Sequence, residues 1–207
     1  ARAAGKILGL QEVRLEGYVD GDLGDTPVNE LRGKIMALIR EVKADIVMSW
    51  DPFAPYEEHP DHRQVAMATL EAAHFSGSPL FYPEHAHAPY QATEMYWFAK
   101  SPVNAELFVD ISGTIEKKIQ ALLAHACQME LTVDMLASEA EALDMDMPML
   151  KSSDQEARSQ LIEMGIRNYF GELGEKASVA FAEQFRYERV GMLEKILGLP
   201  SRGSDFS

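Results

Sequence analysis

The sequence has almost no cysteine, few basic side chains for the number of acidic ones, and no long apolar run. Its single cysteine, Cys127, excludes an internal disulfide and is typical of the reducing cytoplasm, which is the location we predict. The formal net charge of -14, from 33 acidic against 19 basic residues, disfavours binding to nucleic acid or to an anionic membrane surface. No apolar run approaches the roughly 20 residues that span a bilayer, and no basic-then-apolar leader opens the sequence.

A chain of 207 residues, of which 46% are hydrophobic and 25% charged, has the size and composition of one globular domain. We therefore predict a single domain over residues 1–207. The first eight positions have a helical pattern, but no capping residue stands in front of them. We expect an N-terminal portion of the protein to precede this sequence.

Helix and strand patterns alternate through the first half of the chain. Helices are predicted over residues 1–9, 27–43 and 60–74, and strands over 12–16 and, as a buried strand, over 45–50. The helix over 60–74 opens on Pro60, which is favourable at a first helical position. The helix over 27–43 has apolar residues at helical spacing, namely Leu31, Ile35, Leu38 and Ile39. This alternation predicts an α/β protein of Rossmann-like, three-layer architecture with a mostly parallel sheet.

The second half of the chain changes from strand to helix. Aromatic residues and valine predict strands over residues 79–83, 94–99 and 106–111. From Ser112 onward an apolar stripe up to Ala126 predicts helix, and helix is again predicted over 154–197, after a break at 145–149. The C-terminal portion is therefore expected to be helical, with residues 200–207 frayed.

The chemically most distinctive segment is His59-Pro60-Asp61-His62, where a loop meets the predicted helix. It follows the predicted strand over 45–50, and open α/β sheets bind their ligands beyond the carboxyl ends of parallel strands. Two imidazoles and a carboxylate so close together indicate a zinc hydrolase site. A structural alternative is that His59 caps the helix, Asp61 is a first-turn acid and His62 is a surface residue.

The spacing leaves the number of metal ligands in this motif open. Two ligands on one helix face stand at i and i+4, whereas His59 and His62 stand at i and i+3, with the first at the turn. One histidine as ligand and the other as an acid therefore fits as well as two ligands. Asp61, between them, fits the task of fixing a histidine tautomer. The histidines at positions 74, 85 and 87 fit structural roles better than a place among the three protein ligands of a catalytic zinc.

Beyond the motif, the chain resembles the LmbE-like (PIG-L) family of zinc-dependent N-acetylglucosamine de-N-acetylases. The resemblance also covers residues 1–10, 17–23, 39–50, 108–112, 117–128 and 182–186, in the family's order and spacing. It implies a hydrolase that removes an acetyl group from an N-acetylated amino sugar or sugar conjugate. It further implies a Zn²⁺ cofactor, or another divalent transition metal, and hints at a homo-oligomer.

Carried over residue by residue, the resemblance makes His62 the metal ligand. His59 becomes the acid that stabilises the tetrahedral intermediate and protonates the departing amine. Asp61 orients or tunes a histidine, and Asp20 contacts the sugar hydroxyls. The family's other motif, Ala-His-Pro-Asp-Asp, supplies further zinc ligands and a general base, and it does not occur in these 207 residues.

Two other functions were weighed against this one. A catalytically inactive fragment, or a sugar-binding module with an incomplete metal site, would carry the same motif without the activity. A redox enzyme on a Rossmann-like sheet is disfavoured, because no Gly-x-Gly-x-x-Gly turn follows a predicted strand. For a deacetylase, substrate choice would fall to the loops over residues 51–58 and 85–92.

Overall fold

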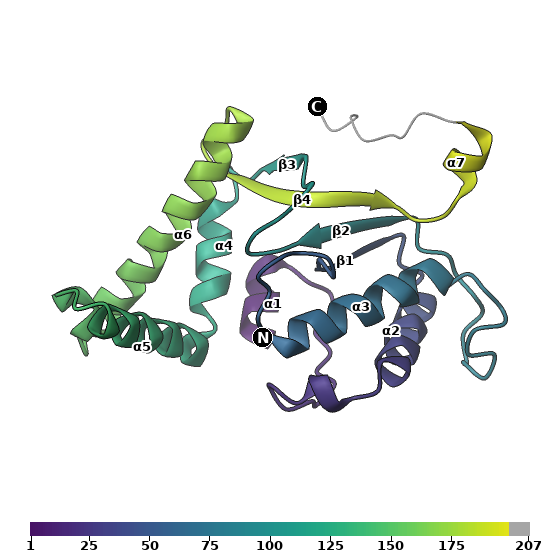
Figure 1. Cartoon of the computed structure of the whole chain (residues 1–207), viewed down its shortest axis with the longest axis horizontal. Helices are drawn as coiled ribbons and strands as arrows, with labels where there is room; N and C mark the ends of the chain where they lie inside the picture. Colours follow the sequence, from purple (N-terminus) through teal and green to yellow (C-terminus); the bar gives the residue numbers. More distant parts are fainter. Residues whose placement is uncertain (199–207) are drawn as a thin grey trace. The chain divides into compact units, whose positions relative to one another are not determined.

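The computed structural model describes residues 1–198, and the chain divides into two compact units (Figure 1). One unit comprises Ala1–Glu16 and Phe108–Glu183, and the other comprises Gly17–Leu107 and the chain from Gln184 onward. The strands form a four-stranded sheet in the order β1 (Ile46–Trp50), β2 (Glu94–Phe98), β4 (Ala182–Arg189) and β3 (Leu107–Asp110). β1 pairs with β2 in parallel, and β2 pairs with β4 antiparallel. The predicted α/β class with an open sheet is confirmed.

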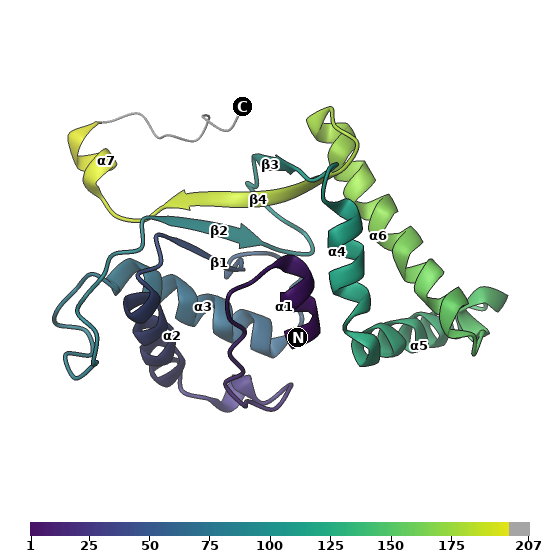
Figure 2. The ribbon, with the colours of Figure 1, turned by 180° about the vertical axis from the view of Figure 1, so that it is seen from behind.

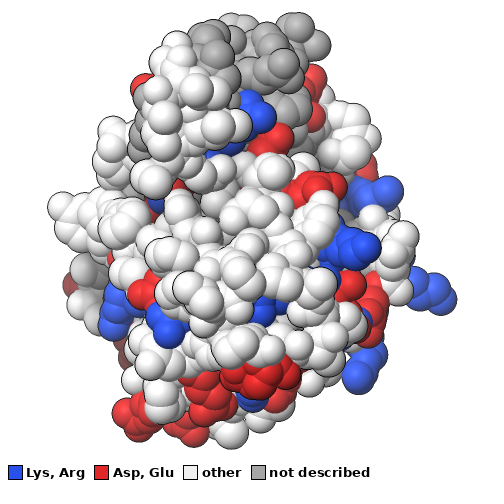
Figure 3. Space-filling model, turned by 90° about the vertical axis from the view of Figure 1, so that its right-hand side faces the viewer, with Lys and Arg blue, Asp and Glu red and all other residues white. Residues whose placement is uncertain are grey.

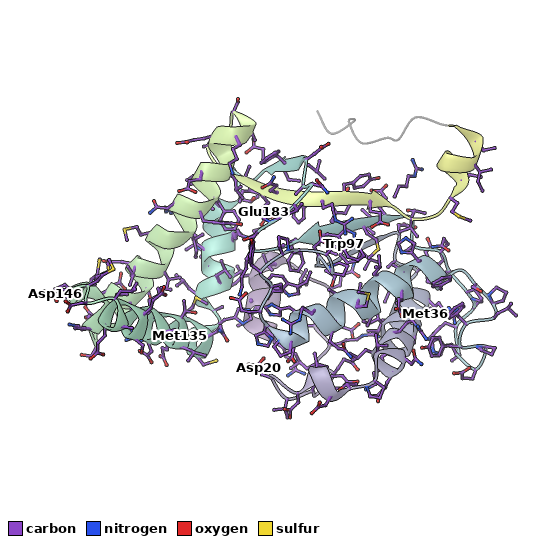
Figure 4. All side chains as sticks on the ribbon, in the orientation of Figure 1. Asp20, Met36, Trp97, Met135, Asp146 and Glu183 are labelled. Carbon is purple, nitrogen blue, oxygen red and sulfur yellow. The ribbon has the colours of Figure 1, made fainter. Side chains whose placement is uncertain are left out.

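In the unit that begins at Gly17, two helices cover one face of β1 and β2. These are α2 (Val28–Val42) and α3 (Pro60–Phe75), and both views of the ribbon show them on the same side of the strands (Figures 1 and 2). Met36 of α2 and Trp97 of β2 are fully buried in the core between these layers (Figure 4). Ala72 and Ala73 of α3 belong to the same core, and their small side chains let the helix lie close to the sheet.

The predicted helices of the first half are confirmed. α1 (Arg2–Leu8) ends at Gly9, whose φ of 82° is the left-handed conformation that glycine adopts without strain. α2 and α3 match the predictions over 27–43 and 60–74, and Pro60 is the first residue of α3. A short 3₁₀ helix, η1 (Leu23–Asp25), precedes α2. No helix among residues 1–198 is both long enough and apolar enough to cross a bilayer.

The predicted strands over 12–16 and 79–83 are wrong, because neither segment adopts extended pairing. In the second segment the reason is a buried side chain of α2. The Arg40 guanidinium donates hydrogen bonds to the main-chain carbonyls of Ser76, Ser78, Phe81 and Tyr82. These backbone acceptors are satisfied by an arginine and have no need of a neighbouring strand.

β1 forms where a strand was predicted, but the prediction that it is buried is wrong. Ile46 and Met48 are 52% and 55% exposed, while Ser49 on the other face is buried. β1 stands at the end of the strand order, and α2 and α3 cover only one of its faces. The run of apolar residues therefore predicted the strand correctly, but it did not predict that one face of the strand is exposed.

The unit that contains residues 1–16 and 108–183 is mainly helical, as predicted. Its helices are α1, α4 (Ile115–Leu123), α5 (Ala126–Ala142), the 3₁₀ helix η2 (Pro148–Lys151) and α6 (Gln155–Ala177). η2 lies at the predicted break. The buried residues form two small cores, one of Ile111, Ile115 and Ile119 and the other of Val133, Ala140 and Leu150.

The helix predicted over 154–197 is wrong between Ala177 and Leu193. Ser178 adopts a left-handed conformation with φ 59° and ends α6. Residues 182–189 then form β4, in which Ala182 and Phe185 are buried. Glutamate, glutamine and arginine in this segment favour helix, but pairing with β2 and burial of the apolar side chains outweigh that preference. α7 (Leu193–Leu197) follows, and the frayed end predicted over 200–207 lies outside the described residues.

The acidic excess does not form one continuous surface on the face that Figure 3 shows. Acidic and basic side chains both occur there, separated by uncharged atoms.

Candidate active site

The His59–His62 motif lies at the start of α3, beyond the carboxyl end of β1, as predicted. His59 is the N-cap residue in an extended conformation, and its Nδ1 accepts a hydrogen bond of 3.3 Å from the main-chain N–H of Asp61. The structural alternative for His59 is therefore realised in part. The cap uses only Nδ1, so Nε2 remains for chemistry.

Asp61 anchors the loop that carries Asp20. Its two carboxylate oxygens accept hydrogen bonds from the main-chain N–H groups of Gly21, at 2.7 Å, and Leu23, at 3.1 Å. The anchored loop places Asp20 Oδ1 3.6 Å from His59 Nε2, with the Asp20 side chain 90% exposed (Figure 4). The structure thus brings the predicted residues Asp20, His59 and Asp61 together, although Asp61 reaches His59 through its main chain and not through its carboxylate.

His62 is held by a carboxylate and two aromatic rings. Its Nδ1 lies 2.9 Å from Glu57 Oε1, and the same oxygen accepts a hydrogen bond of 3.2 Å from the His59 main-chain N–H. The His62 ring stacks on Trp50, with ring centroids 3.9 Å apart, and on His59, at 4.4 Å. The imidazole plane is therefore fixed from both sides.

The hydrogen-bond partners assign opposite tautomers to the neutral forms of the two imidazoles. A carboxylate only accepts, so His62 carries its hydrogen on Nδ1 and has a free lone pair on Nε2. A main-chain N–H only donates, so His59 Nδ1 is bare and its hydrogen is on Nε2. The stacked rings therefore offer one metal-ligating lone pair and one hydrogen-bond donor.

Among the described residues, Asp20, His59 and Asp61 are the cluster whose possible ligand atoms lie within 4.8 Å of one another, and they can hold a metal ion. His62, the predicted ligand, is not in this cluster. However, Asp61 already accepts two main-chain N–H groups, and the bare nitrogen of His59 accepts a third. His62, with a carboxylate on one nitrogen and the other free, has the arrangement usual for metal-bound histidines.

Three residues around this motif were not among the predicted site residues. Glu57 stood next to it but was not paired with His62, and Asp51, an acid directly after a predicted strand, was not singled out. Arg186 was hidden by the prediction of helix, and its side chain now pairs with Asp51. The position of Asp51 and Glu57 after a predicted strand could have marked them as site residues. Nothing in the sequence indicated that Asp51 pairs with Arg186.

The loop over 85–92, predicted to select substrate, lies apart from these contacts. One of its two histidines, His85, has Nδ1 3.1 Å from an Arg40 nitrogen, and burial lowers the pKa of His85. These two residues line a cavity of about 380 Å³ with Tyr82 and nearby prolines. The Arg40 guanidinium donates its hydrogen bonds to main-chain carbonyls of the protein and lies against His85. These contacts agree with a structural role for His85.

Fold and site together define an α/β protein with a polar site of imidazoles and carboxylates beyond a parallel strand. Residues 1–73 match the family model for PIG-L, described as GlcNAc-PI de-N-acetylase. The resemblance to the LmbE-like (PIG-L) family is confirmed.

Curated relatives carry matching names. The chain is 34% identical over 132 residues to a diacetylchitobiose deacetylase of Thermococcus kodakarensis, covering 61% of this chain and 47% of that protein. It is 31% identical over 96 residues to a 1D-myo-inositol 2-acetamido-2-deoxy-alpha-D-glucopyranoside deacetylase of Streptomyces avermitilis, covering 46% of this chain and 30% of that protein. The chain thus spans half or less of the length of these two relatives.

Solved structures show the same fold. The N,N'-diacetylchitobiose deacetylase of Pyrococcus horikoshii superposes with a TM-score of 0.68 at 23% identity, covering 90% of this chain and 61% of that one. The conserved protein TT1542 of Thermus thermophilus gives a TM-score of 0.63 at 21% identity, covering 89% and 68%.

Proposed function

We propose that the protein is a metal-dependent hydrolase that removes the acetyl group from an N-acetylated amino sugar or sugar conjugate. The observation that carries the proposal is the stacked pair of His59 and His62, which presents an N–H donor and a free lone pair side by side. The names of the curated relatives, which act on acetylated sugar derivatives, support the same substrate class.

His62 is the proposed metal ligand, through Nε2, with Zn²⁺ or another divalent transition metal as the cofactor. When bound, such an ion polarises the acetyl carbonyl and makes a water nucleophilic near neutral pH. His62 Nε2 fits a borderline-soft ion, because imidazole nitrogen is a usual zinc ligand, and a catalytic zinc takes two further protein ligands besides it.

His59 and Asp20 are proposed to act on the substrate. The Nε2–H group of His59 points away from the helix cap and can donate a hydrogen bond to the oxygen that becomes negative as the amide carbon turns tetrahedral. In its protonated form, the same residue is the candidate proton donor to the departing amine, and it returns to the neutral imidazole when it gives up that proton. The exposed Asp20 carboxylate, 3.6 Å from His59, is available to sugar hydroxyls. Asp61 keeps both in place through the loop that it anchors.

The alternative is a catalytically inactive fragment or a sugar-binding module. It predicts binding of an N-acetylated sugar without release of acetate. We propose no membrane and no nucleic acid as a partner. The cytoplasmic location, the single domain and the homo-oligomer stay predictions.

The test is acetate release from N,N'-diacetylchitobiose and from an N-acetylglucosaminyl inositol. It uses the 207-residue chain in parallel with the longest chain that the gene encodes. We expect release that stops with a chelator and returns with added Zn²⁺. An unchanged rate in His59→Ala would contradict the role of His59, and sugar binding without acetate release by either chain would favour the binding module.

A further inference from the structure

Glu57 is the buried acid of this site, and half of its carboxylate has no partner. The side chain is 3% exposed. Oε1 accepts from His62 and from the His59 main chain, whereas Oε2 is buried with no hydrogen-bond partner among the described residues. Buried polar atoms without partners are rare and indicate a missing interaction or a functional role.

The charge of Glu57 has little compensation nearby. The Lys100 ammonium lies 3.8 Å from Oε1, but its side chain is 51% exposed and lies closer, at 3.3 Å, to the exposed Glu58. A buried carboxylate is costly unless a positive charge or a metal balances it. The His62 ring is in direct contact with Glu57. A cation bound at His62 Nε2 would polarise the Nδ1–H group that Glu57 accepts, and would thereby offset the negative charge of Glu57.

We propose that Glu57 is a positioning residue that fixes His62 in the Nδ1–H tautomer and, through its uncompensated buried charge, favours a divalent metal on His62 Nε2. This inference rests on the proposed function for the metal only. Glu57, whose side chain is 3% exposed, is assigned no contact with the substrate. Its main chain adds to the role, since the Arg63 guanidinium donates to the Glu57 carbonyl at 2.6 Å and keeps the loop against the first turn of α3.

Two measurements on the 207-residue chain test the proposal. The first is the tautomer of His62 in the metal-free protein, read from the ¹⁵N shifts and long-range ¹H–¹⁵N couplings of the ring, with the signal assigned by its loss in His62→Gln. We expect hydrogen on Nδ1 and a bare Nε2. The second is the affinity for Zn²⁺, and for Co²⁺ by its visible spectrum. Glu57→Gln keeps the shape but removes the charge, and we expect it to weaken metal binding about 10–100-fold.

Glu58→Gln is the matched control. It removes the same charge one position along the chain, from an exposed side chain that pairs with the same lysine and interacts with His62 only through a weak charge effect. Its own main-chain N–H and Lys100 lower the pKa of Glu58, so it is charged in the assay. We expect its metal affinity to change by no more than about twofold, as for an exposed ion pair.

The outcomes separate this proposal from the proposed function. Hydrogen on Nε2 of His62 in the metal-free protein, equal affinities for the Glu57→Gln and Glu58→Gln variants, or no metal binding by the wild-type chain would each overturn the role of Glu57. If the affinities differ as expected but acetate is not released from any N-acetylated sugar, the hydrolase is wrong and the role of Glu57 stands. If acetate is released but Glu57→Gln and Glu58→Gln bind the metal equally well, the hydrolase stands and the role of Glu57 is wrong.

Discussion

Arg186 of β4 holds the carboxylate of Asp51, 135 positions earlier in the chain, through two parallel hydrogen bonds. Nε lies 2.6 Å from Oδ2, and Nη2 lies 2.9 Å from Oδ1. Asp51 directly follows β1 and is 4% exposed, so the pair is largely withdrawn from water. The loop that leads to Glu57 and His59 therefore begins at a residue that is held by β4.

We expect Arg186→Met to destabilise the protein by about 3–5 kcal/mol, because it leaves the buried Asp51 carboxylate without its partner. Urea unfolding measures the loss. Arg167→Met is the control, since Arg167 pairs with Glu116 and Glu163 on exposed surface and its loss should matter much less. The double variant Asp51→Asn/Arg186→Met should recover part of the stability. Equal losses in the two arginine variants would contradict the importance of the Asp51 pair.

Stability in acid should depend on Glu188. The hydrogen bond from His74, followed by those from Trp97 and Arg186, lowers the pKa of Glu188 to about 2. A lowered carboxyl pKa stabilises the folded state above the ordinary value near 4.5, and this contribution is lost as the pH falls toward 2. Between pH 6 and pH 3 we expect the wild type to lose on the order of 1–2 kcal/mol more than Glu188→Gln, allowing for partial exposure. Parallel losses in both proteins during urea unfolding would contradict the shift.

His62→Ala and Asp20→Asn distinguish the two candidate metal positions. If His62 is the ligand, its removal should weaken Zn²⁺ binding strongly, whereas Asp20→Asn should leave the Zn²⁺ affinity nearly unchanged. Calorimetric titration of each variant with Zn²⁺ measures the metal affinity. A larger loss in Asp20→Asn would place the ion at Asp20, His59 and Asp61 instead.

Asp61→Asn should loosen the loop that carries Asp20. An asparagine can accept only one of the two hydrogen bonds from Gly21 and Leu23, and its amide then faces the other donor. We expect a loss of about 1–3 kcal/mol and faster hydrogen exchange at the two main-chain amides. The nearby exposed Asp22→Asn is the control and should leave both amides protected. Unchanged exchange in Asp61→Asn would show that the loop is held by other contacts.

Two glycines of α6 should respond to alanine in opposite directions. Gly165 has open space around its Cβ position, so Gly165→Ala should stabilise the helix by about 1 kcal/mol. A Cβ on Gly174 would lie 2.6 Å from the main-chain oxygen of Ala180, so Gly174→Ala should destabilise by about 1–3 kcal/mol. Thermal unfolding of both variants decides the comparison, and a stabilised Gly174→Ala would mean that the turn after α6 can shift.

The parts of the fold that were predicted correctly depend on local chemistry. Pro60 at a first helical position, Gly9 after a helix and the apolar spacing of α2 each act within a few residues. The errors share a different cause. Residues 79–83 take their conformation from hydrogen bonds with Arg40 of α2, about 40 positions earlier in the sequence, and residues 182–189 take theirs from pairing with β2. Contacts between distant segments leave no periodic pattern in either partner.

The same division holds for the site. The sequence by itself determined that His59, Asp61 and His62 lie at a helix start beyond a strand, since three residues and a proline are enough to specify that turn. Only the tertiary structure decided that Glu57 holds His62, that Asp61 holds the loop of Asp20, and that Arg186 holds Asp51. These pairs depend on where the backbone places each carboxylate, because hydrogen bonds act only over about 3 Å. The roles of the two histidines follow from those neighbours, which assign a lone pair to one ring and an N–H to the other.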